Sequence, residues 1–169
     1  MFRTSTERAG TVKRPASVDD RTSICDFDEE EKHHKHTIEA TLVHFEHAGK
    51  HFNVIDTPGM GNFLGDARAA LRAADAAVVV IDAVSGVQVS TEKVWEAAAE
   101  GFLPRLVVVN RLDRERASIT RALESIHDHL GRTCVLIHLP IGEEKNFKGV
   151  IDLINMRAYT FAPDDSGKT

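Results

Sequence analysis

HFNVIDTPGMG, residues 51–61, joins a strand to a helix through a short turn. The apolar residues before Asp56 suit a pleated, buried strand. Pro58 presets φ for a turn, and Gly59 admits torsions that other residues avoid. Beyond Gly61 the apolar period changes to about 3.6 residues, which predicts a helix with Phe63, Ala67, Ala70, Leu71 and Ala74 on one face. The strand therefore presents a carboxylate at its carboxyl end, where open parallel sheets bind ligands.

Composition limits the function classes. The chain has 169 residues, 42% of them hydrophobic and 28% charged, as expected for one soluble domain. A net charge of −5 gives no electrostatic reason for direct binding to nucleic acid. Cys25 and Cys134 lie far apart without metal-type spacing, which favours a reduced, cytoplasmic setting. No apolar run reaches the about 18 residues that span a bilayer, so no membrane association is expected. Nothing in the sequence indicates an oligomeric state.

The N-terminal region carries charge runs. Residues 1–24 are polar and predict a loop or frayed terminus. An acidic run at 26–31 and a basic run at 32–36 follow, and both are interpreted as a solvated segment. The histidines of the basic run could bind a metal, but no cysteine or carboxylate is placed to complete a set, so none is expected there. They are His33, His34 and His36.

Strand and helix patterns alternate through the middle of the chain. Alternation over 37–46 and a turn at Ala48-Gly49 predict a β-hairpin with the strand ending at Asp56. Continuous apolar runs at 76–81 and 105–109 are typical of parallel strands covered by helices on both faces. A helix capped by Ser90 or Thr91 is expected between these runs, with Trp95 in the core.

The second apolar run is followed by another helix, closed by Gly131, whose inward residues are Ile119, Ala122, Leu123, Ile126 and Leu130. A strand is predicted over 133–139, and short β segments over 150–154 and 158–161. This alternation predicts an α/β, doubly wound, mainly parallel sheet with one antiparallel hairpin.

Asn110-Arg111-Leu112-Asp113 ends the second apolar run, as Asp56 ends the first strand. A carboxylate at Asp113 can accept hydrogen bonds from both N1–H and the exocyclic amine of guanine, which adenine cannot supply together. Asn110 would brace the loop, and the stem of Arg111 could lie against the base. Both motifs also have plain structural explanations, namely helix capping by Asn110 or Asp113 and an Asp-initiated turn at Asp56.

Together these motifs resemble the translational GTPases of the elongation factor G type. Asp56-Thr57-Pro58-Gly59 resembles switch II, residues 25–32 with Thr37 resemble switch I, and the segments 82–87, 91–95 and 110–114 also look like that family. Residues 139–142 and 147–152 resemble the start of the insertion within its G domain. The resemblance covers about residues 20–160, and jointly the motifs are specific.

The resemblance implies a P-loop-GTPase-like fold, GTP or GDP with Mg²⁺ as cofactors, and the ribosome as partner. Thr37 would bind Mg²⁺, Asp56 would hold it through water, and Gly59 would sense the γ-phosphate. Asn110 and Asp113 would select guanine. The implied nucleotide-binding segments are Asp56, Thr57, Pro58, Gly59 and Met60, and Asn110, Arg111, Leu112 and Asp113.

The sequence departs from the family in ways that bear on activity. No GxxxxGK[ST] loop precedes Thr37, and the family's first strand is missing with it. Met60 occupies the usual position of the catalytic histidine, so no catalytic residue is assigned and hydrolysis is expected to be slower by about 10²–10⁴. Arg111 replaces the usual lysine, and residues 34–36 replace Arg-Gly-Ile.

We therefore expect a G-domain fragment of an elongation factor G-like GTPase that is inactive by itself. Its expected parts are a switch I-like segment (1–36), a partial G domain (37–139), the start of an insertion (140–161) and a disordered tail (162–169). An alternative is a non-hydrolysing pseudo-GTPase that acts as an interaction module. A third is an unrelated α/β binding protein with coincidental motifs.

Overall fold

A computed structural model describes residues 29–34 and 37–161. The expectations for the loop at 1–24, the tail at 162–169 and His36 lie outside the described residues. The chain divides into two compact units, Met1–Asp75 and Ala76–Thr169, and each is described by itself.

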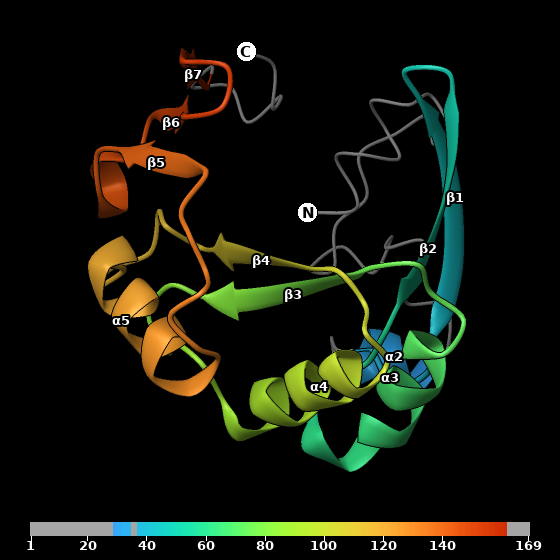
Figure 1. Cartoon of the computed structure of the whole chain (residues 1–169). Helices are drawn as coiled ribbons and strands as arrows, with labels where there is room; N and C mark the ends of the chain where they lie inside the picture. The colour runs from blue at the N-terminus through green and yellow to red at the C-terminus, as the bar shows by residue number, and fades with distance from the viewer. Residues whose placement is uncertain (1–28, 35–36, 162–169) are drawn as a thin grey trace. The chain divides into compact units, whose positions relative to one another are not determined.

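The first unit contains the predicted hairpin. Strands β1 (Thr41–His47) and β2 (Lys50–Asp56) pair antiparallel, from His47 opposite Lys50 to Thr41 opposite Asp56 (Figure 1). At the turn, Ala48 has φ 51° and Gly49 has φ 71°. Two positive φ angles give the turn a twist that matches that of the strands. The hairpin is confirmed, although its first strand begins at Thr41 rather than at residue 37.

Short helices flank the hairpin in the sequence. Helix α2 (Glu29–His34) precedes it, and η1 (Gly61–Phe63) and α3 (Leu64–Leu71) follow it. Ala67 is the buried residue of α3, as the apolar period predicts. The expectation for Gly59 was wrong, because its φ is not in the left-handed region and an added Cβ would meet no atom within 4 Å.

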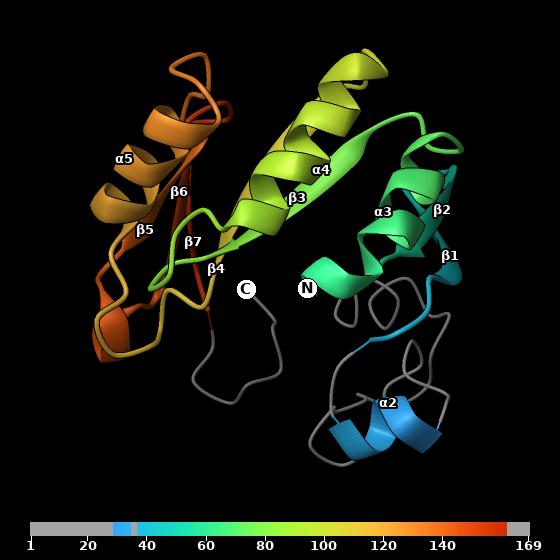
Figure 2. The same cartoon turned by 90° about the horizontal axis from the view of Figure 1, so that it is seen from below.

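The second unit is built on a parallel pair, β3 (Ala77–Asp82) and β4 (Arg105–Asn110). Helices α4 (Val89–Glu100) and α5 (Ile119–His129) lie on one face of the pair (Figures 1 and 2). Trp95 packs against the buried core as expected, and the Arg105 guanidinium lies 4.3 Å from its ring centre. The buried residues of the hydrophobic cluster at this face are Val79, Ile81, Ile126 and Leu130.

The opposite face of β3 and β4 is open among the described residues. Val78, Val80 and Leu106 are 43%, 44% and 46% exposed. The expectation of helices on both faces is confirmed for the face that carries α4 and α5, and it stays a prediction for the other face. The continuous apolar run does not distinguish a strand covered on two faces from one covered on a single face, because both faces are apolar in either case.

Of the strand expected over 133–139, the structure forms only the end, in β5 (His138–Ile141), and the expectation was wrong for residues 133–137. In this stretch the Cys134 carbonyl lies 3.0 Å from His127 Nε2, and the Ile137 carbonyl accepts a hydrogen bond from Leu153 N at 3.0 Å. These backbone groups bond to a side chain and to a later segment, so they do not extend the β3–β4 ladder.

A separate antiparallel sheet forms instead. It consists of β5 (His138–Ile141), β6 (Gly149–Asp152) and β7 (Arg157–Thr160), in that order, with η2 (Glu144–Asn146) between the first two strands. The short β segments expected after residue 149 are confirmed.

The described strands thus form three separate sheets with one parallel and three antiparallel pairings, which is α/β at the coarse level. Across the described ranges, none of the helices has the length and apolar character needed to cross a bilayer.

Candidate functional site

A buried glutamate organises the segment that carries Thr37. Glu31, in α2, is 0% exposed, and its Oε1 accepts hydrogen bonds from the backbone of Ile38 (2.8 Å) and Glu39 (3.1 Å). The interpretation of the acidic run as solvated was therefore wrong at Glu31. A buried carboxylate needs hydrogen-bond partners to offset its lost hydration, and here those partners include the two amides directly after Thr37.

The first predicted strand end is formed by Asp56, the last residue of β2, which is half-buried and lies opposite Thr41. Pro58 is buried and Thr57 half-buried, whereas Met60 is 46% exposed. The Met60 carbonyl accepts from Phe63 N at 3.0 Å, which starts η1. Residues 57–60 therefore connect the strand to the helical segment without strand pairing of their own.

The second strand end lies at Asn110. Asn110 is opposite Asp82 in the β3–β4 register, and its carbonyl accepts from Ala83 N at 2.9 Å. Arg111 then adopts φ 63°, and its carbonyl accepts from Arg114 N at 3.2 Å. The backbone thus turns sharply within the predicted guanine motif. Asp113 is exposed in this turn and Leu112 is half-buried.

The structure rules out the capping explanation for Asn110 and Asp113. Helix α5 begins at Ile119, and its N-cap is Ser118, whose hydroxyl oxygen is 3.5 Å from Arg121 N. A capping residue must lie directly before the first helical turn, and neither Asn110 nor Asp113 does. Helix α4 likewise has Gln88 as its N-cap rather than Ser90 or Thr91, and the Thr91 hydroxyl accepts from Gln88 N at 3.3 Å.

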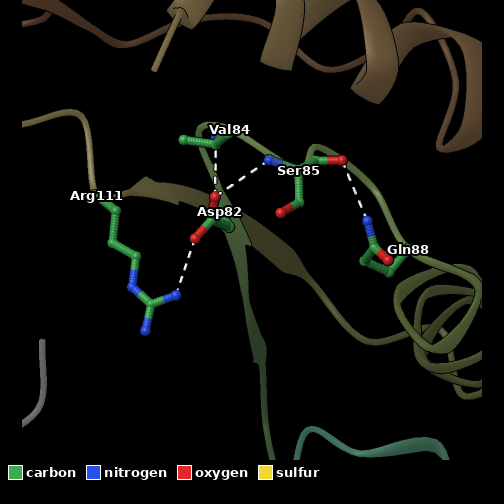
Figure 3. Close-up of polar contacts among 5 residues, drawn as sticks. All are labelled: Asp82, Val84, Ser85, Gln88 and Arg111. Carbon is green, nitrogen blue, oxygen red and sulfur yellow. Dashed lines mark hydrogen bonds and ion pairs between the residues drawn. The ribbon is translucent and has the colours of Figure 1, made fainter. Parts of the chain in front are cut away.

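Asp82, which sequence reasoning did not single out, links the two strand ends of the second unit (Figure 3). Its Oδ1 accepts from Val84 N (2.8 Å) and Ser85 N (3.1 Å), and its Oδ2 accepts from Arg111 Nη1 at 2.9 Å. Burial acts to raise the pKa of Asp82, but the Arg111 hydrogen bond and the two amides outweigh it and lower the pKa below 3.8. The sequence signal that could have identified Asp82 is its position at the end of an apolar strand, like that of Asp56.

The predicted site residues fall into two groups. Thr37 and residues 56–60 belong to the first unit, and residues 110–113 belong to the second. Among the described residues no cluster of three or more histidine, cysteine, aspartate or glutamate side chains could hold a metal ion. A cation at Asp56 would therefore need further oxygen ligands from a bound ligand or water.

Comparison with known proteins gives consistent matches. The sequence model of the elongation factor Tu GTP binding domain matches residues 4–167. Elongation factor G 2 of Streptomyces coelicolor is 40% identical over 163 residues, a stretch that is 94% of this chain and 24% of the relative. The mitochondrial ribosome-releasing factor 2 of Bos taurus is 38% identical over 170 residues, 98% of this chain and 22% of the relative.

A crystal structure of a Thermus thermophilus protein superposes with a TM-score of 0.88 at 34% identity, covering 95% of this chain and 24% of that one. The chain thus spans about a quarter of the length of each of these relatives.

Proposed function

The chain belongs to the family of elongation factor Tu GTP binding domains, and from that premise we propose that it is the guanine-nucleotide-binding part of an elongation factor G-like translation factor. In the parent, GTP hydrolysis would be coupled to work on the ribosome in the cytoplasm. The names of two relatives, an elongation factor G and a ribosome-releasing factor, support the ribosome as partner.

One observation carries the proposal: Asp113 is exposed on a sharp turn after β4 and does not cap a helix. Its carboxylate is thus available for the N1–H and exocyclic amine of guanine. A pocket whose polar groups are left unpaired by the wrong base discriminates by about 10⁴ or more. Asn110, held by Ala83 N, would brace the turn, and the stem of Arg111 would lie against the base.

The metal and phosphate roles follow from the family and fit the donors present. Thr37 and Asp56 offer oxygen ligands, which Mg²⁺ prefers, and the phosphates of GTP would supply others. Mg²⁺ would neutralise charge on the phosphates. The empty space around Gly59, where an added Cβ would meet nothing within 4 Å, supports a backbone left accessible to the γ-phosphate.

The 169-residue sequence contains no phosphate-binding GxxxxGK[ST] loop before Thr37, so we propose that this polypeptide alone binds nucleotide weakly and does not hydrolyse it usefully. We retain the division into a switch I-like segment (1–36), a partial G domain (37–139), an insertion start (140–161) and a tail (162–169).

The experiment is a titration of a fluorescent GDP analogue with Mg²⁺, followed by competition with GDP or ADP. We expect half-saturation well above micromolar and displacement by GDP but not by ADP. The variant Asp113→Ala removes the base-reading carboxylate and should abolish that preference. Micromolar or tighter binding would overturn the inference about the phosphate loop, and equal displacement by ADP would overturn the guanine assignment.

A second candidate is a pseudo-GTPase that keeps the fold as an interaction module. It is favoured by Met60, whose thioether is exposed where the family has a water-positioning histidine. This candidate predicts that the chain sediments with ribosomes equally well with and without nucleotide, and that Asp113→Asn leaves this binding unchanged. Nucleotide-dependent sedimentation would exclude it.

A further inference from the structure

Asp82 occupies a fixed position at the end of β3. The β3–β4 register places it opposite Asn110, and the adjacent Ala83 N donates to the Asn110 carbonyl at 2.9 Å. One carboxylate oxygen closes a tight turn by accepting from Val84 and Ser85. Strand pairing before Asp82 and hydrogen bonds after it therefore fix the backbone at this residue. Its second carboxylate oxygen is not needed for this and can bind another group.

The loop that follows Asp82 is anchored at its far end as well. Val87 N donates to the Ser125 hydroxyl of α5 at 3.0 Å. Gly86 has φ +68°, and an added Cβ would lie 2.8 Å from that same hydroxyl oxygen. The loop of residues 82–87 is thus held between β3 and α5, which gives Asp82 a rigid support.

The remaining oxygen of Asp82 holds Arg111. Arg111 Nη1 lies 2.9 Å from Asp82 Oδ2, and the two side chains are 51% and 22% exposed. Arg111 also has φ 63°, a conformation that residues other than glycine rarely adopt and that surrounding contacts must maintain. The guanidinium–carboxylate bond is directional, so it restrains the stem of Arg111 as well as its charge.

We propose that Asp82 is a positioning residue of the guanine-recognition loop, defined as residues 110–113. Through Arg111 it holds the left-handed turn that presents Asp113, and it orients the stem of Arg111 for the base. This inference rests on the proposed function and adds to it a residue that does not touch the nucleotide. A loop ordered before the base arrives loses less freedom on binding, which strengthens binding of the base.

The test measures hydrogen exchange of backbone amides by NMR in the nucleotide-free 169-residue chain. In Asp82→Asn the amide oxygen can still accept from Val84 and Ser85, so their protection should persist. Protection of the Arg114 amide, which donates to the Arg111 carbonyl, should fall by about two- to fivefold, the range for a partly exposed ion pair. Arg111→Gln should give the same loss, and the double variant should add little to it, because both changes break one interaction.

Glu115→Gln is the matched control, because it removes an exposed acidic charge two residues after the loop and should leave exchange unchanged. Unchanged protection of the Arg114 amide in both Asp82→Asn and Arg111→Gln would overturn the proposal. If Asp82→Asn lowers global stability, the exchange measured in Arg111→Gln, a change at an exposed residue, decides whether the proposal holds. The exchange experiment uses no nucleotide, so a failure of guanine binding in the titration above is separable from a failure of this inference.

Discussion

Replacing Glu31 by alanine tests whether this buried carboxylate orders the segment after Thr37. The side chain is 0% exposed and accepts from two amides at 2.8 and 3.1 Å. A hydrogen bond to a charged group contributes about 1.5–3 kcal/mol. Because both amides share one oxygen atom, we take the lower end of the sum, about 3 kcal/mol. At about 1.4 kcal/mol per tenfold change, this corresponds to about a 100-fold loss of local protection.

The assay is amide hydrogen exchange followed by NMR, read at Ile38 and Glu39. Glu31→Gln keeps an acceptor oxygen but no charge, so its loss should be smaller, about tenfold. Glu39→Ala is the control, because it removes an exposed carboxylate and leaves the Glu39 amide in place. The reasoning would be refuted if, in Glu31→Ala, the Ile38 and Glu39 amides kept their protection within about threefold of the wild type while the protection of α3 was unchanged.

Three further predictions concern the second unit. Ile126→Ala removes a buried core side chain and should lower the free energy of unfolding by about 2–5 kcal/mol in urea melts, whereas Val135→Ala, at a 78% exposed position, should change it by less than about 0.5 kcal/mol. Gly86 has φ +68°, and a Cβ added there would lie 2.8 Å from the Ser125 hydroxyl oxygen, so Gly86→Ala should lower the free energy of unfolding by at least about 1 kcal/mol. Gly65→Ala, in an open part of α3, should be neutral or stabilising. Equal effects of the two variants would contradict the conformational argument. Because the pKa of folded Asp82 is lowered, the unfolded chain binds more protons just below pH 3.8, so stability from Asp82 is present above that pH and lost as the pH falls through the folded pKa. Acid unfolding should therefore be less steep in Asp82→Asn than in the wild type, and identical acid profiles would contradict this.

Local patterns predicted the elements whose residues interact with near neighbours. The hairpin followed from alternation and a two-residue turn, and α5 followed from its apolar face, with Ile126 and Leu130 in the core. These features depend on period and turn chemistry, which the sequence carries directly.

The failures have a different cause. The segment 133–137 has a strand-like composition, but the carbonyls of Cys134 and Ile137 bond to His127 and Leu153, and no local pattern reveals such distant partners. Glu31 looked solvated because burial of a charge depends on amides that fold back onto it, here those of Ile38 and Glu39.

The candidate site was also predicted only in part. Motif chemistry identified Asn110 and Asp113, and the position of the α5 cap at Ser118 removed their competing explanation. Asp82 was missed because its importance lies in a contact across 29 residues of sequence to Arg111. That pairing becomes visible only once the β3–β4 register is known.

The central claim is that residues 110–113 read a guanine base. The most direct measurement is a pair of NMR titrations of the labelled chain, with millimolar GDP and Mg²⁺ in one and ADP and Mg²⁺ in the other. We predict that the amides of residues 110–113 shift on addition of GDP and do not respond to ADP. Equal responses of residues 110–113 to ADP and GDP, or no response of these residues to GDP, would contradict the account.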